Sequence, residues 1–172
     1  DGPIFCRYPR GEGEGVDITD IVQDVKIGKG RIIKRGKDLA ILALGTRVGS
    51  ALKVADHLLE DNLKITVADA RFAKPIDTEL LQKLWNEHQK LIIIEEGSAG
   101  GFSSHCLHFL TSKDLLNKPD KEIKCLTMPD NFQDHASQNE QLAKAGLDTN
   151  GLMKIVFKMI SLSNTKNKSI AN

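Results

Sequence analysis

The sequence predicts a three-layer α/β fold: a mainly parallel sheet with helices on both of its faces. Short, continuous apolar runs at residues 39–44, 63–68, 90–95 and 122–128 are typical of strands that are buried on both faces. Between these runs, apolar residues recur at spacings of three and four, which indicates amphipathic helices. Strands that alternate with helices in this way are joined by right-handed crossovers into a parallel sheet.

Each element has its own sequence signal. A first short strand is expected at residues 31–34, turning at 35–37 into the next strand. Apolar residues at helical spacing predict a helix over 47–61. Asp77 is expected to cap a helix that ends near His88, because its carboxylate can accept from the first free amides. The remaining expected elements are a turn at 97–101 and helices over 102–111, 138–145 and 149–160.

The composition excludes several classes of protein. The 172 residues are 40% hydrophobic and carry a net charge of +1, which argues against a disordered chain and against a dedicated nucleic-acid binder. No apolar run approaches the roughly 20 residues of a membrane span. Cys6, Cys106 and Cys125 are far apart, so neither a disulfide framework nor a zinc site is expected. These features predict a cytoplasmic protein.

Two glycine-containing turns stand where an α/β fold could bind phosphate. The turn at 45–49 lacks both nucleotide-binding spacings, and Arg47 occupies a position where close phosphate approach would need glycine. A plain strand–helix turn with a positive φ at Gly45 is therefore predicted. The glycines of the 97–101 turn precede a helix, so a weak anion site stays open there, although close packing is the preferred interpretation.

Few side chains are spaced for catalysis. The candidates are Glu95 and Glu96 at a strand end, Asp134 and His135 in a loop, and the i, i+3 pair His105 and His108. No ligand is spaced to complete a metal site with the two helical histidines, which are expected to be surface or packed residues. The sequence contains no recognisable nucleophile or metalloprotease signature, and we assign no catalytic residue.

Two arginines flank a Tyr-Pro in the segment RYPRG at residues 7–11. Proline fixes the local chain direction, and a guanidinium offers paired donors to a phosphate or a carboxylate. On these residues alone, a surface arginine in an ion pair is preferred to an anion site.

Five segments in this order resemble one enzyme family. They are RYPRG (7–11), IGKGR (27–31), VADARFAKPID (67–77), EEGSAGGFSSH (95–105) and PDNFQDH (129–135). Together they resemble the carboxyl-terminal part of the 1-deoxy-D-xylulose-5-phosphate synthases, over about residues 2–160. Ser103 and Gln133 depart from the family pattern and are expected to be local packing changes.

The resemblance implies a domain organisation. Residues 1–16 would be the tail of a pyrimidine-binding domain, 17–26 a linker, 27–160 a transketolase C-terminal-like domain and 161–172 a flexible tail. The start of the chain within an apparent strand likewise predicts a piece of a longer protein. The upstream domains of the same polypeptide would be its partners, in a homodimer of the bacterial cytoplasm.

The resemblance also implies an activity. The parent enzyme would condense pyruvate with D-glyceraldehyde 3-phosphate, with loss of CO₂, using thiamine diphosphate and Mg²⁺ bound by upstream residues. Arg10 would hold the phosphate of the aldehyde, and no role is implied for Glu95 or His135. This chain alone would be structural and inactive. Two alternatives stay open: the C-terminal domain of a 2-oxo-acid dehydrogenase β subunit, and a free-standing ligand-binding α/β domain.

Overall fold

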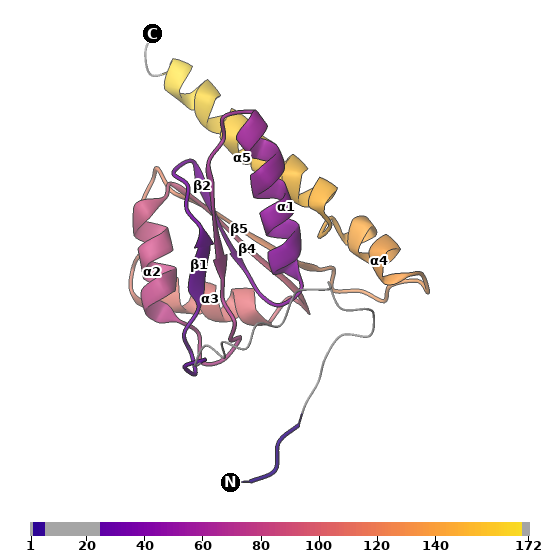
Figure 1. Ribbon diagram of the computed structural model, residues 1–172. Helices are drawn as coiled ribbons and strands as arrows, with labels where there is room; N and C mark the ends of the chain where they lie inside the picture. Colours follow the sequence, from indigo (N-terminus) through magenta and orange to yellow (C-terminus); the bar gives the residue numbers. More distant parts are fainter. Residues whose placement is uncertain (1, 6–24, 170–172) are drawn as a thin grey trace, which may run out of the picture.

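The structure is a computed structural model that describes residues 2–5 and 25–169 (Figure 1). Its elements are β1 (Arg31–Lys34), β2 (Leu39–Ala43), α1 (Arg47–Glu60), β3 (Ile65–Asp69), α2 (Thr78–Glu87), β4 (Lys90–Ser98), α3 (Phe102–Ser112), β5 (Glu122–Met128), α4 (Gln138–Ala145) and α5 (Thr149–Ser169). The strands form one sheet in the order β1-β3-β2-β4-β5. Four strands are parallel, and β1 is antiparallel to β3 at one edge. The predicted α/β class with a mainly parallel sheet is confirmed.

The most apolar strand lies at the centre of the sheet. All five residues of β2 are buried, and the strand pairs in parallel with β3 on one side and β4 on the other. Both faces of a central strand are covered by helices, which is why a continuous apolar run suits this position. The expected turn at 35–37 does not form a hairpin between the first two strands, because β3 lies between β1 and β2.

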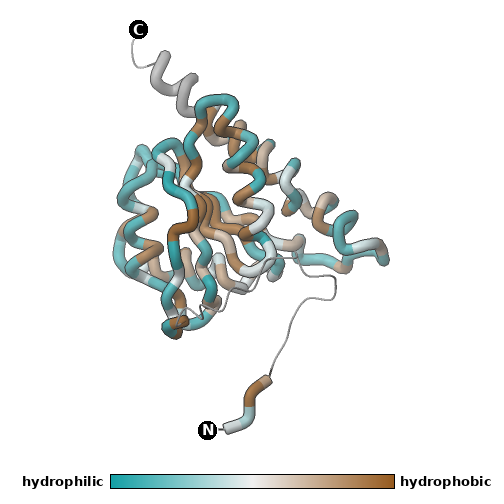
Figure 2. The backbone as a smooth tube through the Cα atoms, viewed as in Figure 1, coloured by the Kyte–Doolittle hydropathy of each residue, from teal (hydrophilic) through white to brown (hydrophobic). Residues whose placement is uncertain are grey.

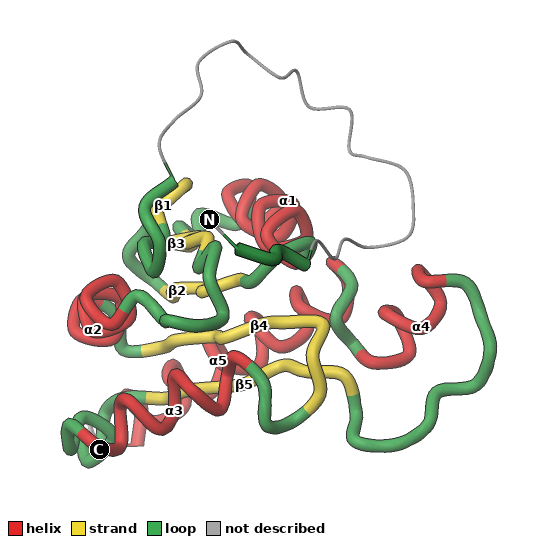
Figure 3. The backbone as a smooth tube through the Cα atoms, turned by 90° about the horizontal axis from the view of Figure 1, so that it is seen from below, coloured by secondary structure: helices red, strands yellow, loops and turns green. Residues whose placement is uncertain are grey.

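Helices cover both faces of the sheet, as the three-layer prediction requires. One core joins alternate β2 residues such as Ile41 to α1 and α5, and the other joins the intervening residues such as Leu42 to α2 and α3. Figure 2 shows the hydrophobic residues concentrated in the strands, and Figure 3 shows the strand order from β1 to β5 with helices on either side. Side chains of a strand point alternately to its two faces, so one apolar run supplies both cores.

Most helix boundaries agree with the sequence signals. Asp77 is the N-cap of α2, and its Oδ1 accepts a hydrogen bond from Leu80 N at 3.0 Å. Helix α4 spans the predicted residues, with a capping box between Ser137 and Glu140. Two elements are longer than predicted: β4 continues past Glu95 to Ser98, and α5 continues past residue 160 to Ser169.

Some predictions concern residues that the structure does not describe. Arg10 lies outside the described residues. So do most of the predicted upstream-domain tail at 1–16, of which only residues 2–5 are described, and nearly all of the linker at 17–26. These assignments stay predictions. None of the helices within residues 2–5 and 25–169 combines the length and the hydrophobicity of a membrane span.

Candidate functional site

Open α/β sheets bind ligands at the carboxyl ends of their parallel strands, so this edge is the first place to look for a site. In β4 this position is taken by the protein's own Glu95, which directly follows the last residue paired with β2 and is 3% exposed. Its Oε2 accepts from Phe102 N at 3.0 Å, and its Oε1 accepts from Ser103 N at 2.7 Å and Ser103 Oγ at 2.8 Å. The carboxylate thus lies against the N-terminus of α3, where an external anion would bind.

The glycines around Glu95 are explained by this packing. A Cβ atom at Gly97 or at Gly101 would lie 2.6 Å from Glu95 Oε2, which is too close for any real contact. The close-packing interpretation of the 97–101 segment is therefore confirmed, and an internal carboxylate occupies the place of the possible anion site. The Ser103 hydroxyl adds a third hydrogen-bond donor to this carboxylate.

The turn after β2 is closed by a second internal network. Gly45 has a φ of 63°, as predicted for a plain strand–helix turn. Arg47 is 7% exposed; its Nη2 lies 3.0 Å from Glu96 Oε1, and its Nη1 donates to the Leu147 carbonyl at 2.8 Å. Thr46 also donates to Glu96 Oε1. This network joins the ends of β2 and β4 to the α4–α5 connection, so the arginine has a structural role.

The carboxyl end of β3 carries a group that was not singled out as a candidate from the sequence. Arg71 has a φ of 58°, an uncommon conformation for a residue with a side chain. Its amide donates to Asp69 Oδ1 at 2.9 Å, while its Nε lies 3.9 Å from Asp69 Oδ2. Arg31 Nε approaches the same Oδ2 at 3.4 Å. Two guanidinium groups share one carboxylate, so this corner of the edge has a net positive charge.

An open groove with a volume of about 520 Å³ lies beside this corner, between β1 and α2. Its lining is mainly charged: Lys26, Lys29, Gly30, Arg31, Ile32, Arg35, Asp77, Glu79, Leu80 and Lys83. Lys29 Nζ donates to Glu79 Oε2 at 2.6 Å, and this hydrogen bond raises the pKa of the ammonium group. Five cationic and two acidic side chains therefore border the groove.

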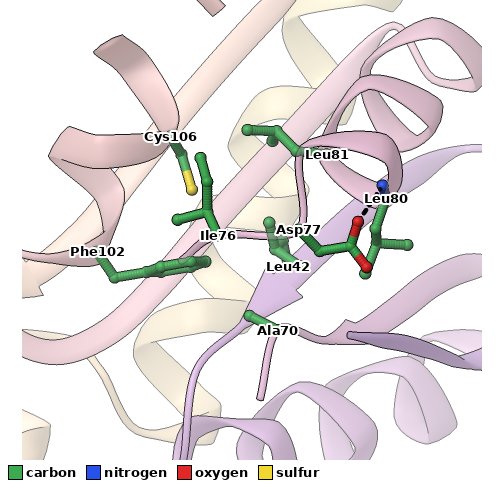
Figure 4. A pocket seen from close by; sticks show the side chains of 8 residues that line it. All are labelled: Leu42, Ala70, Ile76, Asp77, Leu80, Leu81, Phe102 and Cys106. Atoms are coloured by element: carbon green, nitrogen blue, oxygen red, sulfur yellow. Dashed lines mark hydrogen bonds between the residues drawn. The ribbon is translucent and has the colours of Figure 1, made fainter. Parts of the chain in front are cut away.

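A small, partly open cavity lies between α2 and α3, as shown in Figure 4. Apolar side chains such as Ile76 and Phe102 line it, and its volume of about 10 Å³ has room for roughly one water molecule. Cys106 lies on its wall, and burial raises the pKa of this thiol to about 12. Neither the volume nor the thiol suits a substrate or a nucleophile.

The remaining candidates do not come together. His105, His108 and His135 are all exposed. The Asp134 carboxylate forms an ion pair with Lys144 at 2.8 Å, so it is directed at α4. In the part of the chain that the structure describes, no three His, Cys, Asp or Glu side chains are grouped to hold a metal ion.

These observations define a class of protein: an α/β domain whose ligand-binding edge is filled largely by its own side chains. Residues 28–152 match the family described as "Transketolase, C-terminal domain", and the chain belongs to this family. A similar solved structure is titled "Split gene transketolase, inactive beta4 tetramer", with a TM-score of 0.69 and 29% sequence identity. The match covers 83% of this chain and 44% of that chain, so this chain spans less than half the length of that relative.

Transketolase-family enzymes use thiamine diphosphate and a divalent metal, and the described residues do not fit either group. The helix N-terminus that would suit a diphosphate already holds the Glu95 carboxylate, whose negative charge would repel it. Within residues 25–161, no buried polar side-chain atom lacks a partner, and no acidic cluster is available for the metal. No reaction step is therefore derived from this domain.

Proposed function

We propose that the chain is the carboxyl-terminal domain of a 1-deoxy-D-xylulose-5-phosphate synthase. The observation that carries this proposal is the contact between two of the resembling segments. Gly28 of IGKGR packs against Pro75 of VADARFAKPID, and Gly30 N donates to Asp77 Oδ2 at 3.0 Å. The two segments are far apart in the sequence and form one structural unit, which supports a common origin with that family more strongly than separate matches would.

The role of the domain itself is structural. Its carboxyl edge is filled by Glu95 and by the Arg47–Glu96 pair, so it supports upstream catalytic domains of the same polypeptide without binding the cofactor. The relative that forms a tetramer of β chains makes self-association plausible, and we include a homodimer, working in the bacterial cytoplasm, in this proposal. The isolated chain would not turn over substrate.

In the proposed enzyme, Arg10 binds the phosphate of D-glyceraldehyde 3-phosphate. A guanidinium can donate two parallel hydrogen bonds to phosphate oxygens. Arg71, held at the carboxyl edge beside Asp69, is a second guanidinium that an anionic group could approach. The positive corner formed with Arg31 supports an anionic substrate on this side of the domain.

Assays of the intact parent enzyme test the proposal. With thiamine diphosphate and Mg²⁺, it should release CO₂ from pyruvate only when D-glyceraldehyde 3-phosphate is the acceptor. Transfer from a ketose phosphate instead would identify a transketolase, which the 29% identity to one makes the second candidate. Transfer to a lipoyl group would identify a 2-oxo-acid dehydrogenase.

Substitution of Arg10 tests the assigned residue. Arg10→Ala should raise the KM for the aldehyde by about tenfold or more, as expected for the loss of a charge-assisted contact, and leave the KM for pyruvate unchanged. Arg35→Ala is the matched control, because it removes an exposed arginine that lies in the groove of the described domain. An unchanged aldehyde KM in Arg10→Ala would remove the role proposed for this residue.

A further inference from the structure

Residues 28–31 pack tightly on the β3–α2 connection. Gly28 has a φ of 71°, and a Cβ there would lie 2.9 Å from Pro75 Cγ. A Cβ at Gly30 would lie 2.7 Å from the Asp69 carbonyl oxygen and 2.6 Å from Leu80 Cδ2. Only glycine fits at Gly30 without displacing backbone, so these two glycines permit a close approach between distant segments.

Asp77 joins the same two segments through its two carboxylate oxygens. Oδ1 accepts from Leu80 N at 3.0 Å and caps α2, while Oδ2 accepts from Gly30 N at 3.0 Å. The side chain of Asp77 is 8% exposed, so water does not readily replace either donor. One residue thus caps a helix and holds the chain that leads into the domain.

Ion pairs extend the contact on both sides of this hydrogen bond. Lys29 Nζ lies 2.6 Å from Glu79 Oε2 and 3.8 Å from Asp77 Oδ1. Arg31 shares Asp69 with Arg71, so the positive-φ arginine is held by a carboxylate that β1 also contacts. Residues 28–31 therefore touch the connection at its start, near its end and at the beginning of α2.

We propose that residues 28–31, with Asp69, Pro75 and Asp77, form a clamp that positions the β3–α2 connection and the point where the upstream chain joins this domain. Gly30 and Asp77 are its positioning residues. The consequence for catalysis rests on the proposed function: a loosened clamp displaces the connection that presents Arg71 and weakens binding of the phosphorylated aldehyde. The clamp itself is a property of this chain and holds whatever reaction the parent performs.

Asp77→Asn separates the clamp from the helix cap. Asparagine is as good an N-cap as aspartate, but its side chain has one acceptor oxygen and cannot serve both Leu80 N and Gly30 N. Native-state hydrogen exchange of the whole chain should show the Gly30 amide exchanging about tenfold faster or more, as expected for loss of a bond to a charged acceptor. Gly151 N, which donates to Asp148 Oδ1 at 2.8 Å, is the internal control and should be unchanged.

The intact enzyme supplies the second measurement. Asp77→Asn and Gly30→Ala should raise the KM for the phosphorylated aldehyde several-fold, about as much as a small displacement of a binding group can cost, while the KM for pyruvate stays unchanged. Ser137→Ala is the matched control because it removes the cap of α4, which also destabilises the domain but does not touch the clamp. A KM change in this control as large as in Asp77→Asn would overturn the positioning role.

The two measurements separate the possible failures. Unchanged exchange at Gly30 in Asp77→Asn overturns the clamp, whatever reaction the parent enzyme catalyses. Faster exchange at Gly30 together with an unchanged aldehyde KM keeps the clamp and overturns its catalytic consequence. A wild-type enzyme that does not use pyruvate and the aldehyde overturns the proposed function, and the exchange measurement still decides the clamp.

Discussion

The buried carboxylate of Glu95 provides the sharpest test of the structure, through the substitution Glu95→Gln. The carboxylate accepts three hydrogen bonds, two on Oε1 and one on Oε2. A glutamine of the same shape has one acceptor oxygen, so its amide group must face a donor at one of these positions. The substitution therefore leaves a buried N–H of α3 without an acceptor and removes negative charge from the helix N-terminus.

The magnitude follows from these two losses. A buried donor left without an acceptor costs about 1–3 kcal/mol, and the lost interaction of a partly buried charge with the helix dipole costs up to about 2 kcal/mol. We expect Glu95→Gln to lower the free energy of unfolding by about 2–4 kcal/mol, measured by urea denaturation of the chain with circular dichroism.

A matched control uses a glutamate of the same size on the surface. Glu87 lies 3.9 Å from Lys83 as an exposed i, i+4 pair, so Glu87→Gln should change stability by less than about 0.5 kcal/mol. If Glu95→Gln lowers the free energy of unfolding as little as this control does, the Glu95 carboxylate does not stabilise the N-terminus of α3. The conclusion that this carboxylate fills the carboxyl edge of the sheet is then refuted.

Two further predictions concern ionisable groups. Hydrogen bonds from the Ser137 hydroxyl and amide lower the pKa of Glu140. The contribution of this capping box to the stability of the fold is therefore present at pH values above the ordinary pKa of glutamate, and it is lost as the pH falls through the lowered pKa. Ser137→Ala removes the hydroxyl and keeps the amide, so an NMR titration should show the pKa of Glu140 rising toward its ordinary range; an unaltered low value would contradict the capping box. Cys106, with a pKa raised to about 12, should resist alkylation at pH 8 until the chain is unfolded, as read by mass spectrometry, and rapid modification of the native chain would contradict its burial.

The carboxyl edge of the sheet is filled by side chains of the domain itself. In many open α/β sheets, the helix N-terminus and the turn after a central strand hold an anionic ligand. Here Glu95 takes the first position, and the Arg47–Glu96 pair closes the second. Both places are stabilised by charged hydrogen bonds within the chain, and the positive corner around Asp69 is formed by Arg31 and Arg71.

Local signals in the sequence predicted much of the fold. The apolar run of β2 and the cap at Asp77 were read correctly because each depends on neighbouring residues: burial of a continuous run and a short hydrogen bond to the next turn. The positive φ of Gly45 was predicted for the same reason. The position of β1 was not predicted, since the partner of an edge strand is chosen by the packing of the whole sheet.

In the candidate site, too, local features could be predicted from the sequence and long-range contacts could not. The glycines at 97 and 101 were noticed in the sequence, but the carboxylate that they admit was recognised only from the fold, because its donors lie on the following helix. Arg71 was missed because no local pattern predicts a positive φ for an arginine.

By itself, the sequence determined the α/β class, the places of most helices and strands and the membership of the transketolase C-terminal domain family, because these depend on periodicity, capping and residue identity. The tertiary structure alone decided which segments meet: the IGKGR glycines on the β3–α2 connection, and Glu95 on the start of α3. Such contacts join residues that are distant in the chain or belong to separate elements. They arise from the packing of the whole domain, which no local pattern of residues encodes.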